Sequence, residues 1–226
     1  MVNDDMRPHV GGDVVTRRFW LPVVVLCVLA ACQDAAAPVM EPGVIGDVVA
    51  SPTPSSDLHI LQQSPTAPAL ETYEVSFWAR KDRASTVLVN YQPAAGESVG
   101  HPFLRFDVPK DGLRTGGAGV HLGHRDSVLI TLTIDPVNLT VDFEPSGVRF
   151  SGKHPATLAI WYGNANSDLN GDGVVDAADQ ALAEQLAIWG RPAKPAPWMK
   201  TMSKALTGQQ WVLGAIRHFS EYAVSW

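Results

Sequence analysis

The stretch that decides the fold is Ser127-Val128-Leu129-Ile130-Thr131-Leu132-Thr133-Ile134. Its even-numbered positions are all apolar, and its odd-numbered positions include a serine and two threonines. Because successive side chains of a β-strand point to opposite faces, this period of two predicts a strand with one buried face and one solvent-facing face.

The same period recurs from residue 73 to the end of the chain. Alternating segments lie at 73–79, 87–91, 103–108, 139–143, 148–150, 158–162, 211–216 and 219–226. Turn residues separate them, as in Gln92-Pro93, Asp111-Gly112, Gly116-Gly117 and Pro145-Ser146-Gly147. No helical period precedes residue 176. Many short strands with this spacing predict an all-β chain folded as an antiparallel β-sandwich.

One segment breaks the strand series, and it reads Asp168-Leu169-Asn170-Gly171-Asp172-Gly173-Val174-Val175-Asp176-Ala177-Ala178-Asp179. Carboxylate or amide oxygens fall at loop positions 1, 3, 5, 9 and 12, and glycine falls at position 6. This is the ligand spacing of an EF-hand calcium loop, with Asp in place of the usual Glu at the last position.

Calcium takes about six to eight oxygen ligands, and this loop offers a complete set. Gly173 stands where the loop must turn sharply, a backbone shape that a Cβ resists. Four carboxylates this close would repel one another without a cation. The alternative interpretation is a solvated turn rich in Asp and Gly. The expected ligands are the side chains of Asp168, Asn170, Asp172, Asp176 and Asp179 and the backbone carbonyl of Val174.

The loop resembles the calcium repeat of bacterial dockerins, which carry a helix only after the loop. The matching helix is expected at 176–189, with Leu182, Leu186 and Trp189 on one face and Gly190 as its C-cap. Dockerins that bind cohesins have two such repeats, and this chain has one. The resemblance therefore implies calcium binding, with cohesin docking in a polysaccharide-degrading assembly as an alternative function.

The beginning of the chain is typical of an export signal. Arg17 and Arg18 precede an apolar run at 19–31, too short to span a bilayer core of about 30 Å. The run ends in Leu29-Ala30-Ala31-Cys32, which resembles the lipobox of bacterial lipoproteins. That resemblance implies lipidation of Cys32 and an extracytoplasmic, lipid-anchored place in the cell envelope, on the outer membrane or cell surface. An ordinary secretory signal is the alternative.

These observations divide the chain into five segments. We expect a signal peptide at 1–31, an Ala/Pro/Ser-rich disordered tether at 32–70 and the first part of the sandwich at 71–166. The calcium loop and one short helix follow at 167–190 as an insertion, with Trp198 helping to pack that helix on the sheet. The closing strands lie at 191–226. The formal net charge is −6, and the absence of a basic patch argues against nucleic acid as a partner.

The end of the chain carries another resemblance. Residues 216–226 and Phe103-Leu104-Arg105-Phe106-Asp107-Val108-Pro109 resemble strands of ZU-type domains, sandwiches that mostly mediate protein contacts in animals. A subset of that family cuts itself between Phe and Ser, which implies self-cleavage between Phe219 and Ser220 with help from His218. No hydrolase motif is visible. We therefore expect a non-enzymatic calcium-binding lipoprotein whose sandwich binds protein or glycan.

Overall fold

The structure is a computed structural model that describes residues 54–55, 58–135 and 137–226. The expected signal peptide, Cys32 and the first part of the expected tether lie outside the described residues. All described residues belong to one compact unit. Among them, no helix has the length and apolar character needed to cross a membrane.

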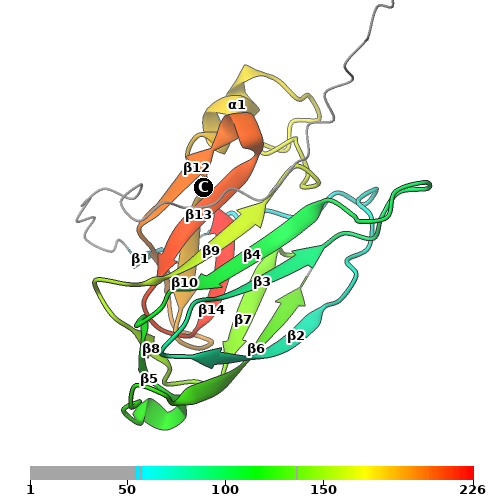
Figure 1. The fold of residues 1–226 in the computed structure, drawn as a ribbon. Helices are drawn as coiled ribbons and strands as arrows, with labels where there is room; N and C mark the ends of the chain where they lie inside the picture. The colour runs from blue at the N-terminus through cyan, green and yellow to red at the C-terminus, as the bar shows by residue number, and fades with distance from the viewer. Residues whose placement is uncertain (1–53, 56–57, 136) are drawn as a thin grey trace, which may run out of the picture. The chain divides into compact units, whose positions relative to one another are not determined.

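The described strands form two larger antiparallel sheets and one small pair (Figure 1). The seven-stranded sheet has the order β1 (Pro54–Ser55), β11 (Trp198–Lys200), β10 (Ala187–Arg191), β14 (Glu221–Ser225), β7 (Thr140–Glu144), β6 (Ser127–Asp135) and β2 (Glu74–Arg80). The five-stranded sheet has the order β12 (Ser203–Leu206), β13 (Trp211–Ile216), β9 (Ala156–Trp161), β4 (Pro102–Val108) and β3 (Ser85–Asn90). The pair is β5 (Leu113–Thr115) with β8 (Arg149–Phe150). The predicted all-β antiparallel sandwich is confirmed.

The deciding stretch forms strand β6, and its alternation is the observed burial pattern. Val128, Ile130, Leu132 and Ile134 are buried, whereas Ser127 and the odd positions after it are exposed or half-buried. β6 lies between β2 and β7, so both of its edges are hydrogen-bonded. The buried face is therefore fixed by register as well as by hydrophobicity.

The core lies where the two larger sheets face each other. Phe106 on β4 and Phe143 on β7 come from different sheets, and their ring centroids are 4.8 Å apart. Phe219 joins them, 5.2 Å from Phe143. Burying each such side chain contributes about 1.5–3 kcal/mol to the free energy of unfolding. This shared cluster holds the sheets together without a disulfide.

The last third of the expected tether, 58–70, packs on the sandwich instead of remaining outside it. Leu61 and Leu70 are 1% and 2% exposed and belong to the main core. Gln63 forms a β-bridge with Ala165, and the Leu61 N–H donates to the Val224 carbonyl at 2.9 Å. The prediction of a tether to residue 70 is wrong for 58–70. The average composition of this segment predicts disorder, but two of its leucines, Leu61 and Leu70, are buried in the core.

The predicted helix at 176–189 is also wrong in extent. Helix α1 spans only Ala177–Ala183, and the chain then enters strand β10, which pairs with β14. Trp189 therefore lies in a strand and packs with Trp198, not on a helix face. Gly190 is no C-cap, because the C-cap of α1 is Glu184 and Gly190 lies inside β10. A Cβ at Gly190 would lie 2.6 Å from Cε1 of Tyr222.

The short helix and the loop before it form the connection between the two larger sheets. β9 belongs to the five-stranded sheet, and β10 belongs to the seven-stranded sheet. The segment between them contains the candidate calcium loop and α1. Figure 1 shows α1 at one end of the sandwich, beyond the end of β13. The candidate site is therefore built into a crossover of the fold.

Candidate metal centre

The loop between β9 and α1 turns at two glycines with left-handed backbone. Gly171 has φ +75° and Gly173 has φ +85°, and a Cβ at either position would meet no atom within 4 Å. Space is therefore not the reason for glycine here. The reason is backbone conformation, which glycine adopts without the penalty of other residues. The predicted sharp turn at Gly173 is present.

The first half of the loop is folded onto its own side chains. Asp168 accepts the Gly171 N–H on Oδ1 and the Gly173 N–H on Oδ2, both at 2.8 Å. Asp172 accepts the Val174 N–H at 2.8 Å and the amide of Asn170 at 2.9 Å. The Asp172 N–H in turn donates to Asn170 Oδ1 at 3.0 Å. The backbone donors of the turn are thus satisfied by predicted ligand residues.

Asp179 ties the two ends of the loop together. Its carboxylate accepts the N–H groups of Leu169 at 2.6 Å and Asn170 at 3.1 Å on Oδ1, and of Asp176 at 2.9 Å on Oδ2. The side chain is 3% exposed. The N–H donors, that of Asp176 above all, lower the pKa of the Asp179 carboxyl below its ordinary value. The hydrogen bonds of Asp179 therefore join both ends of the loop.

Asp176 begins the helix. Its side chain accepts the Ala178 N–H at 2.7 Å, and with Asp179 it forms a capping box at the N-terminus of α1. This cap accounts for the start of the helix at Ala177, within the last residues of the loop. The same aspartate is the expected ninth-position ligand, so one residue serves the helix and the candidate metal set.

The predicted ligands lie along one loop, but they are not gathered at a point. Within the described ranges, no group of three or more His, Cys, Asp or Glu side chains is arranged to hold a metal ion. The carboxylates instead face their own backbone donors. An ionised carboxylate has about four lone-pair sites, and Asp168 uses two of them in the hydrogen bonds above. No described backbone hydrogen bond uses the Val174 carbonyl.

The donor chemistry of the loop fits a hard cation. All six expected ligands offer oxygen, and no sulfur or imidazole lies in the loop. Oxygen-only sets of this kind suit calcium or magnesium and disfavour zinc or copper. The residues that would hold the ion are those predicted by the spacing: Asp168, Asn170, Asp172, Val174, Asp176 and Asp179.

The loop is anchored to the body of the molecule. Leu169 and Ala183 pack against the main core, one from the loop and one from α1. The Asn166 N–H, just before the loop, donates to the Gln62 carbonyl at 2.8 Å. The ordering of this loop is thereby coupled to packing of the sandwich.

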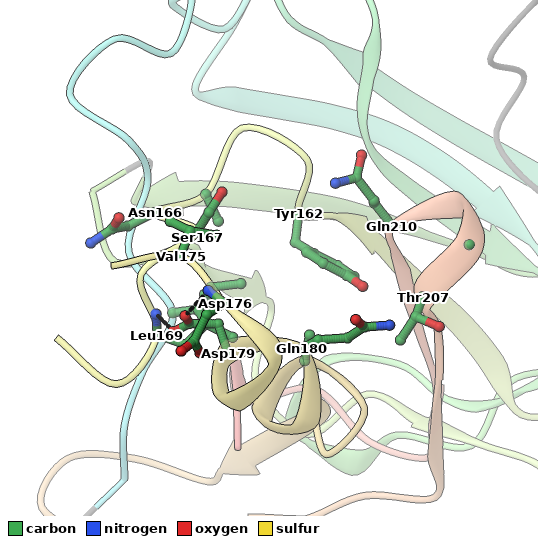
Figure 2. A pocket seen from close by; sticks show the side chains of 14 residues that line it. Tyr162, Asn166, Ser167, Leu169, Val175, Asp176, Asp179, Gln180, Thr207 and Gln210 are labelled. Carbon is green, nitrogen blue, oxygen red and sulfur yellow. Dashed lines mark hydrogen bonds between the residues drawn. The ribbon is translucent and has the colours of Figure 1, made fainter. Parts of the chain in front are cut away.

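A cavity of about 440 Å³ opens between the loop and the sandwich (Figure 2). Figure 2 shows Asp176 and Asp179 on one side and Tyr162, Gln180 and Thr207 on the other. Leu61 and Ala183 provide apolar wall. Burial raises the pKa of the Tyr162 hydroxyl. Sequence reasoning missed this pocket because its walls come from three separate stretches of the chain, at Leu61, between 162 and 183 and between 207 and 210.

The His218-Phe219-Ser220 motif lies directly before strand β14. The Ser220 side chain is buried, and His218 Nδ1 lies 3.4 Å from the Phe219 carbonyl oxygen. No described contact joins His218 to Ser220. Phe219 sits in the aromatic core, and His218 forms a β-bridge with Arg149. The motif is placed as part of a strand entry.

The comparisons with known proteins found no matching family model, no matching curated protein and no matching solved structure. A function for this chain therefore rests on its own residues.

Proposed function

We propose that this protein is a calcium-binding, lipid-anchored extracytoplasmic lipoprotein whose β-sandwich binds protein or glycan. The observation that carries the proposal is the loop at 168–179, in which every EF-hand ligand position holds an oxygen donor. The anchor is proposed from the lipobox-like sequence ending at Cys32. Nucleic acid is not proposed as a partner.

Charge supports the calcium proposal. Asp168, Asp172, Asp176 and Asp179 place four carboxylates within twelve residues, and no Lys or Arg lies in that loop. Like charges at short range disfavour one another's ionised form. Backbone N–H donors offset part of this repulsion, and a divalent cation would offset much more. A bound cation would therefore supply the positive charge that the residues of the loop lack.

The position of the loop between the two sheets explains how calcium binding would stabilise the fold. The loop joins β9 of one sheet to β10 of the other, and Leu169 packs against the core that the sheets share. Because an ion that binds only the folded loop stabilises the folded chain, calcium would act as a clasp on this crossover. The cavity of about 440 Å³ beside it offers polar groups and an apolar wall to a ligand.

Docking to a cohesin is the weaker alternative. The chain contains a single loop of this kind, and after α1 it returns to the sheet as β10. Residues 180–226 contain no second calcium repeat that could pair with this loop. The loop fits a clasp inside a sandwich better than half of a docking module.

Thermal unfolding with calcium or with EDTA tests the proposal. Extracellular loops of this kind bind with Kd of roughly 10⁻⁴ to 10⁻³ M. At ten times Kd, linkage adds about 1.4 kcal/mol to the free energy of unfolding. For a chain of this size, that raises the melting temperature by about 3–6 °C.

Two variants make the measurement specific. Asp168→Ala removes a first-position ligand and should abolish the calcium shift. Glu184→Ala removes an exposed carboxylate at the end of α1, outside the ligand set, and should leave the shift intact. Equal melting temperatures with calcium and with EDTA in the unchanged chain would contradict the proposed role.

A further inference from the structure

Three arginines from separate parts of the sequence line one cavity of about 580 Å³. Arg114 comes from β5, Arg149 from β8 and Arg217 from the segment after β13. His121 and His218 also line it, and Phe150 is its buried aromatic wall. No acidic side chain lines it. For a chain of formal net charge −6, this is a local excess of positive charge that overall composition does not explain.

Backbone pairing holds these residues side by side. Arg149 pairs with Thr115 on one side and forms a β-bridge with His218 on the other. Thr115 also bridges His121, and its hydroxyl donates to the Gly147 carbonyl at 2.9 Å. Four segments are thus joined edge to edge. The backbone of the cavity wall is therefore fixed by hydrogen bonds between these segments.

The guanidinium groups are not used in ion pairs with described carboxylates. Arg114 and Arg149 have no carboxylate partner in the described part of the chain, and Arg217 donates only weakly, to the Met202 thioether at 3.9 Å. All three side chains are exposed. By contrast, Arg80 and Arg191 each contact a carboxylate at 2.6 Å. The cavity therefore keeps its hydrogen-bond donors available for a ligand.

Besides two histidines, the basic residues of this cavity are three arginines and no lysine, and that selects the ligand chemistry. A guanidinium presents donors in a planar fork that matches the oxygens of a phosphate group, which a lysine does not. A phosphate monoester carries about −1.5 to −2 at neutral pH and three acceptor oxygens. A single carboxylate would leave most of the charge of three arginines unmatched. The volume lies within the range of about 300–1,000 Å³ typical of small-molecule sites.

We propose that this cavity, framed by Arg114, Arg149 and Arg217, is a binding site for a phosphate-bearing ligand. The phosphate would lie among the guanidinium groups, and the rest of the ligand would lie against Phe150. The same chemistry is offered by a soluble phosphate ester and by a phospholipid headgroup.

The site is separate from the calcium loop. Strands β9 and β13 pair from Trp161–Trp211, next to the loop, to Ala156–Ile216, next to the cavity. The two sites therefore lie at opposite ends of these strands, as Figure 1 shows for α1 and β8. Failure of either proposal leaves the other standing.

The test is titration of the purified chain with inorganic phosphate by calorimetry, with acetate as the singly charged comparison. Arg149→Gln should weaken phosphate binding about tenfold or more, since it removes a charge-assisted pair. Lys204→Gln removes the same charge from an exposed position on strand β12 and should leave the affinity unchanged. Because Arg149 is exposed and has no described side-chain partner, the variant should melt at the wild-type temperature without phosphate.

A second arm identifies the source of the phosphate. Binding to phosphatidylcholine vesicles that contain phosphatidic acid, over phosphatidylcholine alone, would support a lipid headgroup if Arg149→Gln reduces it. Binding to glycerol 3-phosphate without vesicle binding would support a soluble ester. Absence of binding to phosphate and to both probes would overturn the proposal. So would an equal loss of affinity in Arg149→Gln and Lys204→Gln, which would indicate only general charge attraction.

Discussion

At the scale of single residues, Asp179 accepts three backbone hydrogen bonds in the candidate metal centre. It joins Leu169 and Asn170 at the start of the loop to Asp176 at its end. A carboxylate is needed there, because three N–H donors converge on two oxygens. An amide offers one oxygen and would direct N–H toward N–H. This residue joins the loop to the helix cap, and through its bond to the Leu169 N–H it is connected to a side chain that packs on the sandwich core.

Asp179 therefore gives the chain a defined pH dependence. Its pKa is lowered in the folded state, so its contribution to stability is present above the ordinary Asp pKa of about 3.9 and is lost as pH falls through the lower folded pKa. We expect Asp179→Asn to be less stable than the unchanged chain at pH 6 and to lose less of its stability between about pH 4 and pH 2. Denaturant unfolding in EDTA at both ends of this range measures the difference. Parallel curves for the two proteins would contradict it.

The His218-Phe219-Ser220 motif supports a second prediction at this scale. Self-cleavage needs the Ser220 hydroxyl to attack the Phe219 carbonyl with a base at hand, and His218 makes no described contact with that hydroxyl. We expect the purified chain to keep its C-terminus through Trp226. Intact mass under denaturing conditions measures this. Loss of the seven residues from Ser220 onward, with rescue of the intact mass in Ser220→Ala, would establish cleavage instead.

At the scale of elements, the return of the chain from α1 to the sheet is the feature most easily tested. Gly190 lies in β10 against the Tyr222 ring, so Gly190→Ala places a methyl group about one ångström too close. We expect a loss of about 1–3 kcal/mol in the free energy of unfolding. Gly208→Ala is the matched control, because a Cβ there meets nothing within 4 Å. If both substitutions leave stability unchanged, β10 does not pack as described.

The elements also show how far the sequence alone predicts this structure. Strand β6 was predictable because its alternation is local and one face of it is buried. The apolar residue Trp189 fits either a helix face or a strand, and tertiary pairing of β10 with β14 decides for the strand. Leu61 is buried by distant partners that composition does not reveal.

The same reasoning separates the two candidate sites. All six expected calcium ligands lie within twelve consecutive residues, so their spacing alone identifies the loop and its glycines. The arginines of the proposed phosphate site lie at 114, 149 and 217, far apart in the sequence. Only the pairing of β5, β8 and the segment after β13 brings them together. A site whose residues are brought together only by strand pairing cannot be identified from a local sequence motif.

At the scale of the whole molecule, the proposed calcium clasp has a consequence beyond the loop. The loop links β9 to β10, and Leu169 and Ala183 pack on the core that both sheets share. If the described unit opens cooperatively, an ion that binds only the closed loop slows every global opening. Calcium should then protect amides far from the ligands.

Hydrogen exchange measures this directly. With calcium at ten times Kd, the most protected amides of β6 and β14 should exchange about tenfold more slowly than in EDTA, the same factor for both strands. In Asp168→Ala the two conditions should give equal rates. Protection confined to 168–183, with unchanged rates in β6 and β14, would show that calcium orders the loop alone. In that case the ion would be a local ligand of the crossover and not a clasp between the sheets.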